Sequence, residues 1–132
     1  MNKTIRASVA AAAAAATLLT PAAAFAKGGG GGGDVVEGAC FGAVTYKLKA
    51  AAKPANQIGA EFEVDANRVG QEWRVSLFHN GSRVVLDTFT TRGLSGSFSV
   101  RKLVPDADGD DTFRARAVRL SDGQTCGGRL VF

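Results

Sequence analysis

The sequence is poor in the residues that carry most enzyme and metal chemistry. It has one histidine, one tryptophan, one tyrosine and two cysteines in 132 residues. The histidine, His79, lies beside an Asn-Gly turn with no evident second ligand, so we expect an ordinary surface residue and neither a zinc site nor a Ser-His-Asp arrangement. Because no nucleophile, base and orienting group can be assembled, we expect no enzyme activity and no cofactor.

Long hydrophobic runs are also missing. The apolar run from Ala7 to Leu19 is too short to span a bilayer. Lys3 and Arg6 precede it, and Ala24-Phe25-Ala26 offers the small residues of a cleavage site. Residues 1–26 therefore predict a cleavable secretory signal, and we expect a secreted or extracytoplasmic protein, in the periplasm or at the cell surface, without a transmembrane segment after cleavage.

Cleavage changes how the charge is interpreted. The formal net charge falls from +4 to +2, because Lys3 and Arg6 leave with the signal. So small an excess gives no reason to expect a nucleic acid partner. The unbroken run Gly28 to Gly33 indicates a flexible leader over residues 27–37, which serves as a tether or keeps the cleavage site accessible; we favour the second. One domain is expected over residues 38–132.

Beyond residue 40 the sequence lacks a helical period and instead alternates with a period of two, interrupted by turn residues. This pattern predicts an all-β domain of seven strands, which fold into two antiparallel sheets packed face to face. The strands are expected at about 43–52, 58–65, 71–79, 82–90, 95–103, 111–120 and 125–132. Outside the hairpin discussed next, the residues expected to face inward are Val44, Tyr46, Leu48, Ile58, Ala60, Phe62, Val64, Phe98, Val100, Phe113, Ala115, Ala117, Cys126, Leu130 and Phe132.

Asn80-Gly81 predicts a two-residue hairpin, because both residues tolerate the positive φ of a type I′ turn. The register that follows has paired residue numbers summing to 161. It places Trp73, Val75 and Leu77 on the core side, opposite Thr88, Leu86 and Val84 respectively, and Arg74 outside, opposite Asp87. Trp73 is therefore expected to pack in the core rather than to bind a sugar ring.

The two cysteines, Cys40 and Cys126, lie near opposite ends of the exported part of the chain. In a compartment that permits disulfides they predict one structural bridge. The alternative is a free reactive pair. A bridge that closes so long a loop restricts the unfolded chain strongly.

Two features resemble an immunoglobulin-like or fibronectin type III-like sandwich. Trp73 stands in the third predicted strand, and Asp111-Thr112-Phe113 enters the sixth, where such domains often carry Asp-x-Tyr. The bridge is placed differently from that of antibody domains, where it joins the second and sixth strands. In this resemblance, however, the first and last strands can run parallel and adjacent, so that their starts meet.

Residues 38–132 also resemble small secreted bacterial proteins of uncharacterised function. The shared residues are Gly70-x-x-Trp73, Asn80-Gly81, Ser95-Gly96-Ser97-Phe98, Gly109-x-Asp111 and a cysteine in the last strand. This resemblance brings no known activity.

The immunoglobulin-like topology implies which strands share a sheet. Strands 43–52, 58–65 and 95–103 would form one, with outward charges that alternate in sign and are typical of a solvated surface. The other sheet would present a basic and aromatic face, against only Glu72 and Asp87. Its candidate ligand-binding residues are Arg74, Phe78, Arg83, Val85, Phe89, Arg114, Arg116 and Arg129.

Unbalanced arginines beside exposed apolar side chains favour an interface, although β propensity and solubility also explain them. The sequence therefore predicts a secreted, non-enzymatic binding or cell-surface interaction domain, whose partner is an anionic cell-envelope polymer or an extracellular protein. The alternative is a secreted inhibitor or small-ligand carrier that uses its loops or a cleft.

A cluster of carboxylates suggests a second kind of site. Asp106, Asp108 and Asp110 resemble a calcium loop, but an EF-hand needs Gly at position six and Glu at position twelve, where this chain has Asp111 and Ala117. We therefore expect an ordinary loop between two strands.

Overall fold

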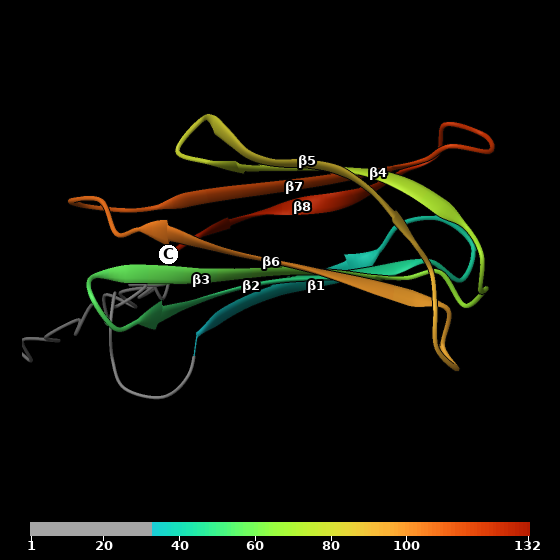
Figure 1. Cartoon of the computed structure of the whole chain (residues 1–132), viewed down its shortest axis with the longest axis horizontal. Helices are drawn as coiled ribbons and strands as arrows, with labels where there is room; N and C mark the ends of the chain where they lie inside the picture. Colours follow the sequence, from blue (N-terminus) through green and yellow to red (C-terminus); the bar gives the residue numbers. More distant parts are fainter. Residues whose placement is uncertain (1–32) are drawn as a thin grey trace, which may run out of the picture.

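The structure, a computed structural model, describes residues 33–132 as two antiparallel sheets packed face to face (Figure 1). The predicted all-β sandwich is confirmed. The strands are β1 (Asp34–Ala39), β2 (Thr45–Lys53), β3 (Gln57–Asp65), β4 (Glu72–His79), β5 (Ser82–Thr90), β6 (Ser97–Pro105), β7 (Thr112–Arg119) and β8 (Thr125–Val131). Their order is β1-β2-β3-β6 in one sheet and β5-β4-β7-β8 in the other. Within residues 33–132, no helix is long and apolar enough to cross a membrane.

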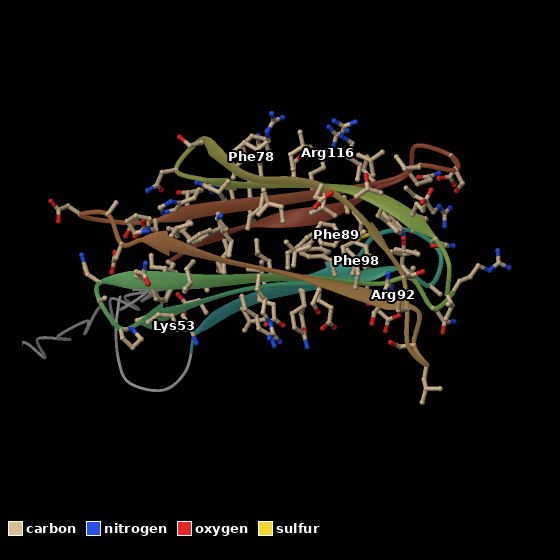
Figure 2. All side chains as sticks on the ribbon, in the orientation of Figure 1. Lys53, Phe78, Phe89, Arg92, Phe98 and Arg116 are labelled. Atoms are coloured by element: carbon tan, nitrogen blue, oxygen red, sulfur yellow. A yellow bond between two sulfur atoms is a disulfide. The ribbon has the colours of Figure 1, made fainter. Side chains whose placement is uncertain are left out.

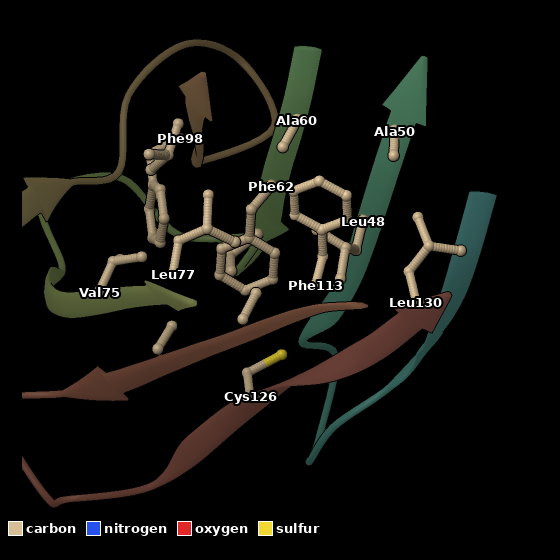
Figure 3. Close-up of a cluster of buried hydrophobic side chains, with 14 of the residues drawn as sticks. Leu48, Ala50, Ala60, Phe62, Val75, Leu77, Phe98, Phe113, Cys126 and Leu130 are labelled. Carbon is tan, nitrogen blue, oxygen red and sulfur yellow. The ribbon is translucent and has the colours of Figure 1, made fainter. Parts of the chain in front are cut away.

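The core lies between the sheets, because alternation sends every second side chain of each strand inward. Outside the 82–90 strand, the predicted inward residues are buried, except Tyr46, which is half-buried and packs against the core. Phe62, Leu77 and Phe113, from β3, β4 and β7, meet in its centre (Figure 3). Burying a side chain of this size stabilises a fold by about 1.5–3 kcal/mol.

Three connections carry the chain from one sheet to the other: β3 to β4, β5 to β6 and β6 to β7 (Figure 1). Thr91, which is fully buried, joins the first two. Its hydroxyl donates to the carbonyl oxygen of Arg68 at 2.5 Å and accepts the backbone N–H of Gln71 at 2.9 Å. This polar residue is accommodated in the interior because its hydroxyl is satisfied both as a donor and as an acceptor.

Strand β1 is an eighth strand, which the sequence did not predict. It pairs with β2 from Asp34 opposite Ala50 to Ala39 opposite Thr45, so the last part of the expected leader, 27–37, is a strand. The sequence pattern of this strand is weak, because Val35 and Val36 are the only apolar residues between the glycine run and Glu37. The predicted secretory signal, residues 1–26, lies outside the described residues, as do residues 27–32.

Strand β5 follows the predicted register only next to the turn. Asn80 and Gly81 have the positive φ values that the turn requires, 48° and 83°, and Phe78 pairs with Arg83 as expected. The register then shifts between Leu77 and Phe78. An extra residue at this bulge reverses which side chains of β5 face inward.

The bulge corrects several predictions. Trp73 pairs with Phe89, and Arg74 faces Thr88 rather than Asp87. Phe89 stacks on Phe98 with ring centroids 5.6 Å apart, whereas Leu86, expected inside, is 40% exposed. The shift is favourable because a phenyl ring buries much more apolar surface than the threonine that the uniform register would place inside.

We predict that Phe89→Ala lowers the free energy of unfolding by about 2–3 kcal/mol, somewhat less than a fully buried phenylalanine would. Leu86→Ala, on the outer side of the same strand, should change it by less than about 0.5 kcal/mol. Urea unfolding of both variants measures the difference. A larger loss for Leu86→Ala would mean that β5 keeps the uniform register.

The predicted disulfide is confirmed. Cys40, in the connection between β1 and β2, is bonded to Cys126 of β8, with their Cα atoms 5.2 Å apart and a sequence separation of 86 residues. Because β2 and β8 belong to different sheets, the bond ties one sheet to the other near the two ends of the domain.

We predict that Cys40→Ser/Cys126→Ser lowers the free energy of unfolding by about 4–5 kcal/mol, because the unfolded chain regains the freedom of a long loop. Denaturant unfolding with and without reductant measures it. The wild-type protein should lose this stability on reduction, and the double variant should not respond to reductant. Equal stability of both oxidised proteins would contradict the prediction.

Candidate functional site

A row of arginines crosses the outer face of the β5-β4-β7-β8 sheet. The register places Arg83 opposite Phe78, Phe78 opposite Arg114, and Arg114 opposite Arg129. Arg116 lies in the neighbouring row, between Ser76 and Gly127. Phe78 and Arg116 extend away from the core on this side of the sandwich (Figure 2). Four strands thus contribute to one basic surface.

An open groove of about 760 Å³ runs over this surface and reaches the disulfide. Its floor is made largely of small residues, and arginines with one phenyl ring form its sides. We call it the arginine groove; it is lined by Ala39, Cys40, Ser76, Phe78, Arg83, Arg114, Ala115, Arg116, Thr125, Cys126, Gly127, Gly128 and Arg129.

The positive charge of the arginine groove is not neutralised by neighbouring acids. None of its lining residues is Asp or Glu, and within residues 33–132 its four arginines form no ion pair. Arg114 and Arg129 stand directly opposite each other, an arrangement that repulsion makes unfavourable. The Arg114 guanidinium lies over the Phe78 ring, 4.8 Å from its centroid, so a cation–π contact holds it in place.

The outer face of the opposite sheet is neutralised, as its alternating signs predicted. Lys47 lies 3.7 Å from Glu37, and the Nε atom of Arg101 lies 2.9 Å from Glu61. The register pairs Lys49 with that same Glu61. A groove over this face is lined by four basic residues and one acid, namely Lys49, Lys53, Arg101, Lys102 and Glu61, whereas no acid lines the arginine groove.

The structure divides the predicted ligand-binding residues into three groups. Five line the arginine groove: Phe78, Arg83, Arg114, Arg116 and Arg129. Arg74 is exposed on the same face but does not line the groove. Val85 and Phe89 were predicted wrongly, because the bulge turns both toward the core, and Figure 2 shows Phe89 beside Phe98 between the sheets.

The groove floor was missed by the sequence reasoning, although Gly127-Gly128 within a strand is a recognised sign of close approach. A Cβ atom on Gly127 would lie 2.0 Å from the Ala115 carbonyl oxygen, and one on Gly128 would lie 2.3 Å from the Tyr46 hydroxyl. Gly127 therefore cannot carry a side chain without a shift of the backbone, and Gly128 cannot carry one unless the Tyr46 ring moves. As a result the floor between Arg116 and Arg129 is bare backbone.

His79 is not the surface residue that was predicted. Its side chain is only 11% exposed, its ring stacks on Phe113 at 4.9 Å, and its Nε2 atom lies 2.6 Å from Oδ1 of the fully buried Asp111. The Nδ2 group of Asn80 and the N–H of Ala107 also donate to this oxygen. The pair joins the tip of the β4–β5 hairpin to the loop before β7.

This polar cluster positions one end of the arginine groove. Asn80 exchanges two further hydrogen bonds with Thr112, through its backbone N–H and its side-chain carbonyl, both at 2.8 Å. The turn between Phe78 and Arg83 is thereby held against the start of β7, two residues before Arg114. Among the described residues, the His79 ring contacts the side chains of Asp111, Asn80 and Phe113.

The calcium alternative finds no support in the described region. Residues 33–132 contain no group of three His, Cys, Asp or Glu side chains that could hold a metal ion, so Asp106, Asp108 and Asp110 do not form one. The backbone N–H of Asp106 instead donates to the Asn56 carbonyl at 2.9 Å, which joins this loop to the β2–β3 turn.

Arg119 was not singled out by sequence, and its role is internal to the fold. Its guanidinium lies 4.7 Å from the Phe41 ring centroid and 5.8 Å from that of Trp73, which is buried as predicted. It also donates to both carboxylate oxygens of Asp122, which lowers the pKa of Asp122 below its ordinary value. This arginine is therefore neutralised, in contrast to those of the groove.

The sequence matches no protein-family model, and a search of curated proteins finds no match. Function is therefore inferred from the residues of the site.

We predict that Arg129→Gln raises the free energy of unfolding by about 0.2–1 kcal/mol, because it removes the repulsion with Arg114. The gain should shrink as salt screens the two charges. Thermal melting at low and high salt measures it. Arg101→Gln, which breaks the ion pair with Glu61, is the control and should give no gain; a loss of stability in Arg129→Gln would contradict the prediction.

Proposed function

We propose that this protein is a secreted, non-enzymatic binding domain that holds an anionic partner in the arginine groove. The observation that carries the proposal is the charge of the groove: four arginines and no carboxylate line it. A fold has no structural need to place Arg114 opposite Arg129, so the arrangement is best explained by a ligand that supplies the missing negative charge.

Export is supported by two independent features. The sequence begins with the pattern of a secretory signal, and the domain contains a disulfide that would not persist in a reducing compartment. The periplasm, the cell surface and the medium are all consistent with these features. The anionic partners within reach there are envelope polymers and extracellular proteins.

The strand order supports the resemblance to immunoglobulin-like and fibronectin type III-like sandwiches. Strands β2, β3 and β6 share one sheet, and β5, β4, β7 and β8 share the other, as that resemblance implies. The added strand β1 and the position of Cys40 are differences from it. A fold of this kind hosts many functions, so the groove rather than the fold carries the proposal.

The proposal predicts that purified protein is retained on isolated cell envelopes or on polymer from the medium. Arg114→Gln/Arg129→Gln should weaken retention about ten-fold or more, because one charge-assisted hydrogen bond is worth about 1.5 kcal/mol or more. Co-sedimentation over a range of protein concentrations measures the affinity.

Lys53→Gln/Lys102→Gln is the matched control, because it removes the same charge from the opposite sheet, and it should be retained like wild type. Circular dichroism and melting show that the variants fold. The proposal is wrong if wild type is not retained on any material, or if the arginine variant is retained as well as the control. A small molecule that co-purifies in place of polymer would indicate a carrier, and inhibition of secreted hydrolases an inhibitor.

A further inference from the structure

We infer that the ligand of the arginine groove is an extended polymer carrying repeated oxyanions, phosphate or carboxylate, which lies across the strands along the row Arg83, Phe78, Arg114 and Arg129. This inference rests on the proposed function and names the class of ligand. It follows from the spacing of the arginines, the shape of the groove and the chemistry of its floor.

The spacing of the row favours several anions over one. Neighbouring strands in a sheet lie about 4.8 Å apart, so the backbone positions of Arg83 and Arg129, at the two edges of the sheet, are about 14 Å apart. Arg116 stands about 7 Å further along the strands. A single phosphate or carboxylate is much smaller than this span, whereas a chain with repeated charges can contact each guanidinium in turn.

The shape of the groove favours a chain that continues beyond it. Sites for small molecules are usually concave pockets that bury most of the ligand. The arginine groove is open and crosses four strands to reach Cys40. Because Ser76 and Gly127 leave its floor low, a polymer can pass between the arginine side chains without displacing them.

The chemistry of the groove argues against a protein partner. The centre of a protein interface is usually apolar and rich in exposed aromatic rings. Phe78 is the one aromatic residue of this groove, and the Arg114 guanidinium covers its ring. The partner would therefore meet the N–H groups of Arg114 rather than an apolar surface. A planar guanidinium held in this way is suited to bidentate contact with phosphate or carboxylate.

Binding of defined polymers to the full chain tests the inference. The probes are long-chain polyphosphate, a linear polyuronate, inorganic phosphate, the monomeric uronic acid, poly-glutamate and a single-stranded oligonucleotide, measured by calorimetry at several salt concentrations. We expect at least one of the first two to bind, and affinity to rise with chain length until the chain spans about 14 Å. Polyphosphate or polyuronate as the tighter ligand identifies phosphate or carboxylate as the source of the charge.

The dependence of affinity on salt concentration reports how many arginines contact the polymer. If four arginines neutralise a flexible polyanion, the slope of log affinity against log salt should be about −2.8, and Arg114→Gln/Arg129→Gln should halve it to about −1.4. Arg114→Lys/Arg129→Lys should keep the slope but weaken binding several-fold, because lysine retains the charge and loses the bidentate contact. Lys53→Gln/Lys102→Gln is again the control and should bind like wild type.

Three results would overturn the inference: monomers that bind as tightly as their polymers, tighter binding of poly-glutamate or the oligonucleotide than of both polymers, or no binding of any probe. The envelope-retention experiment distinguishes failure of the polymer inference from failure of the proposed binding function. Retention that depends on Arg114 and Arg129 without polymer binding would leave the binding function standing and reject the polymer. Absence of both envelope retention and polymer binding would reject the proposed function and the polymer inference together.

Discussion

The bulge in β5 reconciles two demands that a uniform hairpin cannot meet together. The Asn80-Gly81 turn sets the register of its nearest residues, which places Arg83 opposite Phe78 on the outer face. Burial of the largest apolar side chains sets the register further along, where Phe89 pairs with Trp73 and stacks on Phe98. One inserted residue satisfies both demands. The core and the arginine groove each depend on it.

The outer faces of the two sheets differ in how their charges are arranged. On the β1-β2-β3-β6 sheet, acids lie between basic residues and form ion pairs with them. On the other sheet, Arg114 and Arg129 repel each other, and the disulfide and the buried core hold the strands together regardless. Stability supplied by the interior thus permits a surface on which like charges repel each other.

The buried polar groups show the limits of pattern-based inference at the site. His79 and Asp111 are 32 residues apart in sequence, and no local motif around either residue predicts their contact. Their contact exists because the β4–β5 hairpin tip and the loop before β7 meet at the same end of the sandwich. Once together, they share hydrogen bonds with Asn80 that fix the turn beside the groove.

Several properties of this protein follow from the sequence by itself, because each depends on local order along the chain. Alternation with a period of two determines the all-β class and most inward residues, and the lone pair Cys40 and Cys126 determines the bridge. Five of the eight residues proposed for the binding face also follow from alternation and line the groove.

Only the tertiary structure decided the rest. It added β1, whose few apolar residues gain a partner only beside β2, and it turned Val85 and Phe89 inward, because burial against the opposite sheet outweighs a uniform register. It also brought Gly127 against the backbone of Ala115 and Gly128 against the ring of Tyr46, which explains why both are glycine. Each of these depends on contacts between strands distant in sequence, which no local pattern records.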